Sequence, residues 1–258
     1  MEKENIILSQ QDRRKTMFRI CVLIFLAALL FRLVELALNP LLSRDAALYL
    51  TQAELWYETG DYTKTLLPGN EVPPLQLWTI KTIMALGCGA EVAGRTMSLF
   101  LGSLLPAVAF LLAWKIGGRI RIALVAALLT IVHSELASYS YQPLRENYYL
   151  FFEGLLLVFL VDAARKDAVW KWCICGILFS LAFFSRYEIL EFLLLIPLLL
   201  AFLVFRRRMK LKRAFANISA FYLFSGLTFL SLLSLVDFDI TFLARFTYYL
   251  NKLFFKSS

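Results

Sequence analysis

The sequence predicts an all-α polytopic membrane protein with about seven transmembrane helices. Of its 258 residues, 60% are hydrophobic, and the mean hydropathy is +0.69. Apolar runs recur along the chain, and a helix of about 20 apolar residues crosses a hydrocarbon core of roughly 30 Å. Basic residues collect in alternate segments between these runs, which is the pattern that sets membrane topology.

The first apolar run, 18–38, follows a basic segment, 1–17, that we expect to form a cytoplasmic tail. The run is long and lacks a small-residue cleavage pattern, so we expect a retained helix rather than a signal peptide. Six further spans and a C-terminal interfacial tail at 236–258 complete the transmembrane region, 18–235. The expected spans are 96–114, 122–139, 147–161, 172–184, 189–205 and 215–235.

The long first loop, 39–94, is predicted to contain two helices outside the bilayer core, at 44–57 and 74–86. The second is short and amphipathic, begins with proline, and is expected to lie in the membrane interface. Treating it as a span would reverse every later loop and place Arg206, Arg207 and Arg208 outside. With it in the interface, 17 of the 27 Lys and Arg residues fall in four cytoplasmic segments, as the positive-inside rule requires. The protein is therefore predicted to lie in the plasma (inner) membrane with its amino-terminus in the cytoplasm.

Several other classes of function are not supported. The net charge of +8 reflects loops that set topology, so no nucleic-acid partner is expected. Cys173 and Cys175 lack a third nearby ligand, and Asp237 with Asp239 do not complete a cation shell, so no metal site is assigned. The only histidine, His133, is expected to be a hydrogen-bonded packing residue. No internal repeat with matching broken helices is evident, which argues against a transporter.

Charged residues that do not look like simple anchors all fall on the predicted outer side. They are Arg44, Asp45, Glu71, Arg145, Glu146, Arg186 and Glu188. Acidic groups and arginines at one membrane face suggest a site for an anionic, lipid-linked substrate. Arginine matches phosphate with a planar fork of donors, although anchoring to lipid headgroups is the alternative for arginines near span ends.

Asp45 and Tyr49 are four residues apart and share a face if 44–57 is helical. Asp45 is either a general base or, like Ser43, a helix N-cap. Within the spans, Glu153 either lines a cavity or is protonated and packed. Arg32 and Glu35 are placed to pair with each other.

A set of short motifs in the first loop resembles one family. The motifs are Arg44-Asp45-Ala46-Ala47-Leu48-Tyr49, Gly60-Asp61-Tyr62, Glu71-Val72-Pro73-Pro74-Leu75-Gln76-Leu77-Trp78, Gly87 and Arg95. Together they are similar to the polyprenyl-phosphate-sugar glycosyltransferases with the integral-membrane GT-C fold, which include protein O-mannosyltransferases and the aminoarabinose transferase of lipid A. The resemblance extends over about residues 18–205.

The resemblance implies roles for particular residues. Asp45 matches the proposed catalytic carboxylate of the first loop, and Glu71 and Glu146 match acids that line the site. Arg145 and Arg186 match positions that meet the donor phosphate. Many relatives carry a lysine directly before Pro-Pro, where this chain has Val72. The expected substrate-binding residues are Arg44, Tyr49, Glu71, Arg145, Glu146, Arg186 and Glu188.

The resemblance therefore predicts inverting transfer of a sugar from a polyprenyl-phosphate donor to an envelope acceptor, on the extracytoplasmic side. The acceptor is a glycan, a lipid or a protein, and membrane lipids are further partners. No cofactor is assigned, and a divalent cation stays open. Relatives usually continue with more spans, so two alternatives are kept. One is a truncated, non-catalytic chain that works with a partner membrane subunit, and the other is a transporter or flippase for lipid-linked sugars.

Overall fold

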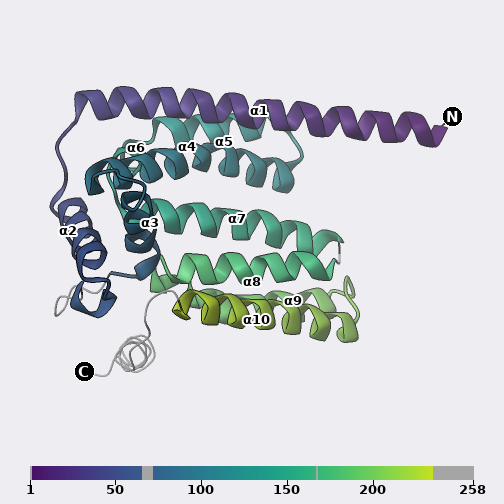
Figure 1. The fold of residues 1–258 in the computed structure, drawn as a ribbon. Coiled ribbons are helices and arrows are strands. Elements are labelled where there is room, and N and C mark those ends of the chain that lie inside the picture. Colours follow the sequence, from purple (N-terminus) through teal and green to yellow (C-terminus); the bar gives the residue numbers. More distant parts are fainter. Residues whose placement is uncertain (1, 66–71, 167, 235–258) are drawn as a thin grey trace, which may run out of the picture.

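A computed structural model describes residues 2–65, 72–166 and 168–234, and the described chain is a bundle of long helices with two helices across one end (Figure 1). Every regular element in these ranges is helical, which confirms the all-α class. The α-helices are α1 (Glu2–Leu38), α2 (Arg44–Thr59), α3 (Pro74–Met84), α4 (Ala90–Gly117), α5 (Ile120–Val132), α6 (Ser134–Tyr141), α7 (Arg145–Lys166), α8 (Val169–Phe183), α9 (Phe192–Phe205) and α10 (Leu211–Ser234). Two short 3-10 helices, η1 (Tyr62–Thr65) and η2 (Tyr187–Glu191), complete the described secondary structure.

Each of the seven predicted spans corresponds to one helix or helix pair. Five of these are long and apolar enough to cross a membrane, and a sixth is the bent pair α5 and α6. Helix α8, at 15 residues, is apolar but shorter than the others. Residues 2–17 of the predicted tail continue the helix of the first span as part of α1. The chain is a multi-pass membrane protein by the length and composition of these helices.

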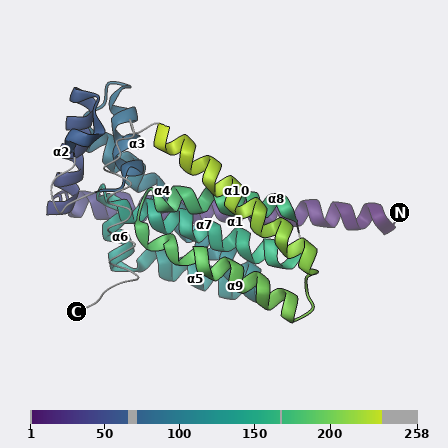
Figure 2. The same ribbon diagram turned by 90° about the horizontal axis from the view of Figure 1, so that it is seen from below.

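The two ends of the bundle differ in what they carry. Helices α2 and α3 lie together at one end in both views, and the amino-terminus lies at the other (Figures 1 and 2). The first residues of α7 and the last residues of α8 also lie at the end with α2 and α3, because these two successive helices run in opposite directions. The opposite end receives the α4–α5, α7–α8 and α9–α10 connections, which hold the basic segments.

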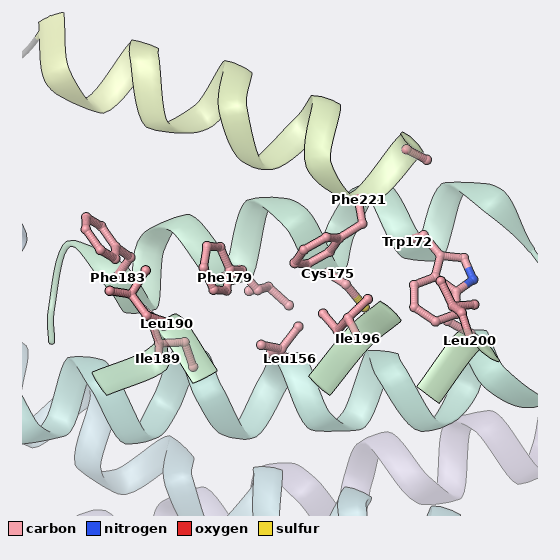
Figure 3. Close-up of a cluster of buried hydrophobic side chains, with 14 of the residues drawn as sticks. Leu156, Trp172, Cys175, Phe179, Phe183, Ile189, Leu190, Ile196, Leu200 and Phe221 are labelled. Atoms are coloured by element: carbon pink, nitrogen blue, oxygen red, sulfur yellow. The ribbon is translucent and has the colours of Figure 1, made fainter. Parts of the chain in front are cut away.

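The largest apolar core lies between α7, α8, α9 and α10, and Figure 3 shows its side chains. Phe179 of α8 faces Leu156 of α7, Phe183 lies beside Ile189 of η2, and all four are buried. Cys175 is fully buried in the same cluster, where it behaves as a small apolar residue. This core fixes the relative positions of α7 and of the turn after α8, both of which carry candidate site residues.

The third predicted span is not a single helix. The chain breaks at His133, whose backbone is extended, and α5 and α6 meet there at 61°. The His133 ring nitrogen Nδ1 accepts a hydrogen bond from the Leu136 amide at 3.5 Å and so caps α6. The predicted span 122–139 is therefore a bent helix pair. His133 is hydrogen-bonded as expected, but it is exposed and not packed in the interior.

Arg32 stabilises this break. Its side chain is fully buried and donates to the carbonyls of Ile131 at 2.6 Å and Thr130 at 3.0 Å, near the end of α5. A helix terminus leaves such carbonyls without intrahelical partners, and a cation there also complements the helix dipole. Within the described chain, Arg32 and Glu35 form no direct ion pair, and Glu35 acts on Arg32 only through a longer electrostatic interaction. Glu35 instead accepts from Asn39 at 3.4 Å.

We expect Arg32→Met to lower stability, because it keeps the apolar stem but leaves two partly buried carbonyls without these donors. Unsatisfied buried groups cost about 1–3 kcal/mol each, so the melting temperature in detergent should fall by several degrees. Arg19→Met is the matched control, because Arg19 is exposed on the same helix. Equal melting temperatures for the two variants would contradict a capping role for Arg32.

An ion network joins three helices at the basic end. Asp162 of α7 pairs with Lys115 of α4 at 2.6 Å and with Lys171 of α8 at 2.9 Å. Arg165 donates to the backbone carbonyls of Lys115 and Ile116. Four groups at this end are therefore neutralised or hydrogen-bonded within the bundle.

Candidate functional site

The start of α2 places Asp45 at the edge of the bundle end. Ser43 is the N-cap, and its hydroxyl accepts from the Ala46 amide at 3.2 Å. Ser43 is held in turn by its own amide, which donates to the Gln142 side chain at 3.0 Å. Capping therefore falls to Ser43 and not to Asp45, whose exposed carboxylate follows two residues later in the first turn. Tyr49 lies one turn further and is buried.

The Gly-Asp-Tyr motif holds the loop after α2. Gly60 ends the helix with a φ of 72°, a left-handed conformation that glycine adopts without strain. The Asp61 carboxylate accepts from the Thr63 amide at 2.9 Å and from its hydroxyl at 2.7 Å. The Tyr62 hydroxyl donates to the Val72 carbonyl at 2.6 Å. Val72 is buried, so the position where relatives carry lysine belongs here to the apolar core of the loop.

Helix α3 is fixed against the ends of two bundle helices. It begins at Pro74, as predicted, and the Leu75 amide donates to the Phe184 carbonyl at 3.0 Å. The buried Gln76 side chain donates to the Pro143 carbonyl at 2.6 Å. Helix α3 is outside the set of candidate spans. Its contacts bring the segments before α7 and after α8 to the same place.

Arg95 of the motif set is a structural residue. It donates to Glu91 on its own helix at 2.8 Å, to the Pro40 carbonyl after α1 at 2.6 Å, and to the Tyr141 carbonyl at the end of α6 at 3.3 Å. These bonds tie α4 to α1 and α6, and they hold the frame around the first loop.

The charged residues predicted from separate spans meet at this end of the bundle. Arg186, after α8, pairs with Glu146 of α7 at 3.3 Å and with Glu188 of η2 at 2.7 Å. Arg145 lies 3.8 Å from the same Glu146 carboxylate. Glu146 thus lies between two guanidinium groups that are 41 residues apart in the sequence. The four residues form what we call the arginine–glutamate cluster.

Tyr49 connects this cluster to Asp45. The guanidinium carbon of Arg145 lies 5.9 Å from the centre of the Tyr49 ring. Burial raises the pKa of the Tyr49 phenol, and the carboxylates of Glu146 and Asp45 raise it further, whereas Arg145 and Arg186 lower it. Charges from α2, α7 and the turn after α8 therefore act on one hydroxyl, which stays protonated at neutral pH.

The two arginines differ in how firmly they are held. The hydrogen bond to Glu188 raises the pKa of Arg186, and its guanidinium also lies 5.7 Å from the Tyr149 ring. Arg145 makes no hydrogen bond with any described residue; its contacts are the longer pair with Glu146 and the Tyr49 ring. Arg145 therefore has more donor capacity available for an anionic group, and Arg186 is the more rigid of the two.

Other predicted residues are not brought into this cluster. Arg44 is exposed and has no contact with the cluster in the described chain. Glu71, Asp237 and Asp239 lie outside the described residues.

Sequence reasoning missed Tyr149. It follows Glu146 by three residues and so shares its helix face, and that spacing was the available signal. Glu153, one turn further along α7, is half-buried and interacts with the Tyr149 hydroxyl.

The acidic groups of the cluster are engaged by arginines. Glu146 faces Arg145 and Arg186, and Glu188 faces Arg186. Among residues 2–65, 72–166 and 168–234, no three His, Cys, Asp or Glu side chains are grouped so as to hold a metal ion. The arrangement instead offers guanidinium donors for a phosphate, a separate exposed carboxylate at Asp45, and a tyrosine hydroxyl between them.

The fold and this cluster define a class: a polytopic helical membrane protein with a phosphate-compatible arginine site at one end of its bundle. The family model of the dolichyl-phosphate-mannose-protein mannosyltransferases matches residues 71–236, and the chain belongs to this family. It is accordingly a membrane glycosyltransferase of the kind that uses polyprenyl-phosphate sugar donors. The match includes Arg145, Glu146, Arg186 and Glu188, and it begins after Asp45 and Tyr49. A comparison with curated proteins gave no match.

Proposed function

We propose that this chain transfers a sugar from a polyprenyl-phosphate donor to an acceptor hydroxyl by a single inverting displacement. The site would be the end of the bundle where α2, α7 and η2 meet. The observation that supports this most directly is that Arg145, Glu146 and Arg186 lie together beside Tyr49, one helical turn after Asp45. These residues come from three separate segments of the chain, α2, α7 and the turn after α8.

In this proposal, the donor phosphate binds to Arg145, and Arg186 supports it from the opposite side of Glu146. The donor is a phosphodiester with one negative charge. When the bond between the anomeric carbon and the phosphate oxygen breaks, that oxygen keeps the electron pair and the lipid phosphate becomes a dianion. A guanidinium at this position binds the leaving group more tightly as charge develops, which lowers the barrier.

Asp45 is the proposed general base. Its carboxylate accepts the proton of the acceptor hydroxyl as that oxygen attacks the anomeric carbon from the side opposite the phosphate. The leaving phosphate is stable as an anion, so no strong general acid is needed. One displacement inverts the anomeric configuration.

The proposed orientation follows from the distribution of charge. The basic α4–α5, α7–α8 and α9–α10 connections lie at the end away from the cluster, and the positive-inside rule favours a cytoplasmic position for them. The cluster then faces the extracytoplasmic side of the inner membrane. The acceptor in this proposal is an envelope glycan, lipid or protein.

The test is transfer by the purified chain from radiolabelled polyprenyl-phosphate sugars, with the anomeric configuration of the product determined by NMR. Arg145→Gln should lower kcat/KM for the donor by about 10–100-fold, the equivalent of one charge-assisted hydrogen bond of 1.5–3 kcal/mol. Arg121→Gln, an exposed arginine at the opposite end, is the control and should stay near the unmodified rate. A product with retained configuration, or equal kinetics for the two variants, would refute the proposal.

A further inference from the structure

A basic hollow lies at the end of the bundle away from the arginine–glutamate cluster, where α9 turns into α10. Its volume is about 680 Å³, and its lining consists of Val204, Arg207, Arg208, Met209, Lys210 and Arg213. Figure 2 shows the α9–α10 connection on the side opposite α2 and α3. Four of the six lining residues are cationic and none is acidic. Nothing in the proposed sugar transfer uses this part of the chain.

The turn that forms the hollow is anchored and not a loose loop. The amides of Arg207 and Arg208 donate to the Val204 and Leu203 carbonyls, each at 2.9 Å. Met209 is buried, and its sulfur accepts from the Asn217 amide group at 3.4 Å. Arg207 has a φ of 54°, a left-handed conformation that costs a non-glycine residue energy and persists where the surroundings hold it.

The charge of this hollow contrasts with that of the neighbouring connections. At the ends of α4, α7 and α8, Asp162 neutralises Lys115 and Lys171. The α9–α10 hollow has no acid in its lining, and the amino-terminal end of α10 adds the positive end of a helix dipole. Such an arrangement attracts a compact anion with several oxygen acceptors, and phosphate is the group that arginine forks fit best.

Exposed apolar side chains flank the same turn. Phe205 is 83% exposed at the end of α9, and Leu211 is 61% exposed at the start of α10. Phe202 and Phe215, one turn away on each helix, are also largely exposed. A free phosphate ion gains no binding energy from apolar neighbours, whereas a phospholipid presents a phosphate and acyl chains together.

We propose that this hollow binds the phosphate headgroup of an anionic phospholipid from the leaflet at the basic end of the bundle. The guanidinium groups of Arg207 and Arg208, with the ammonium group of Lys210, hold the phosphate oxygens. The acyl chains lie against Phe205 and Leu211. The site is separate from the sugar-transfer site, so its test does not depend on the proposed activity.

The test uses the full chain in detergent and native mass spectrometry to measure the affinity for added phosphatidylglycerol. Substituting Arg207→Gln together with Arg208→Gln should weaken binding roughly 30-fold, from the contribution of each basic residue near an anionic headgroup. The control pair, Arg119→Gln together with Arg121→Gln, removes the same charge from the exposed α4–α5 turn at the same end. This control pair should change the affinity by less than about 3-fold, because exposed charges that do not contact the headgroup are largely screened by salt.

Two further probes separate the lipid from other ligands. Phosphatidylcholine, which has no net charge, should bind at least 10-fold more weakly, and inorganic phosphate at the same concentration should not displace phosphatidylglycerol. Equal losses in both double variants would show diffuse charge attraction and overturn the site. Displacement by inorganic phosphate would overturn the lipid assignment. If the first double variant does not fold, Lys210→Gln provides the same comparison, with binding unchanged as the overturning result.

Discussion

Asp45→Asn should strongly lower turnover while leaving the fold and donor binding intact. A general base contributes about 10²–10⁴-fold to a rate, so kcat should fall by that range. The asparagine keeps the size of the side chain, and Ser43 continues to cap α2. The lost charge in the first turn of the helix costs only about 0.3–1 kcal/mol of helix–dipole interaction. The effect therefore belongs to chemistry and not to stability.

The measurement combines transfer rates with retention of radiolabelled donor by the purified protein. Glu54→Gln is the matched control, because Glu54 is an exposed acid of the same helix and, nine residues on, projects from the opposite face. It should transfer sugar at the unmodified rate. If Asp45→Asn turned over within a few-fold of the original chain, the base would be another group. A non-catalytic subunit would show no difference between the two variants.

Gly176→Ala should cause a large loss of stability from a single methyl group. The backbone of α10 lies close to Gly176 of α8, and an added Cβ would overlap the Phe221 carbonyl oxygen and lie 2.8 Å from the Ser225 amide nitrogen. Both atoms are backbone, so relief requires the two helices to move apart. Their separation would also break the bond from the Ser180 hydroxyl to the Ser225 carbonyl, now 2.8 Å. Overpacking of this kind costs about 3 kcal/mol.

Gly226→Ala provides a control within the same helix pair. A Cβ at Gly226 meets nothing within 4 Å, and alanine is the better helix former by about 1 kcal/mol. That variant should melt at the original temperature or slightly above it, followed by circular dichroism in detergent. If the two alanine variants melted together, the close contact of α8 and α10 would be wrong.

The helices were predictable because apolar length and charge are local properties of a segment. Each predicted span corresponded to a helix or a helix pair, and the start of α3 was placed at Pro74 from the conformational preference of proline alone. The bend at His133 was not predictable, because its stabilising partner, Arg32, lies 101 residues earlier in the chain. A charged residue inside a span signals a partner, but the sequence pattern favoured the nearby Glu35 over distant carbonyls.

The candidate site shows the same division. Residue type and the predicted side of the bilayer singled out Asp45, Arg145, Glu146 and Arg186 as outer charges, and the family resemblance supplied their expected roles. The sequence could not show that Glu146 lies between two arginines, or that Arg186 is held by Glu188 while Arg145 is not. Those differences arise from distances between side chains on separate helices, and these distances are determined only by the tertiary packing of the helices. The local sequence therefore determined the class of protein, the positions of the helices and the chemical groups of the candidate site. Which of those groups pair with each other was decided by the packing of α7 and the turn after α8 against α3 and Tyr49.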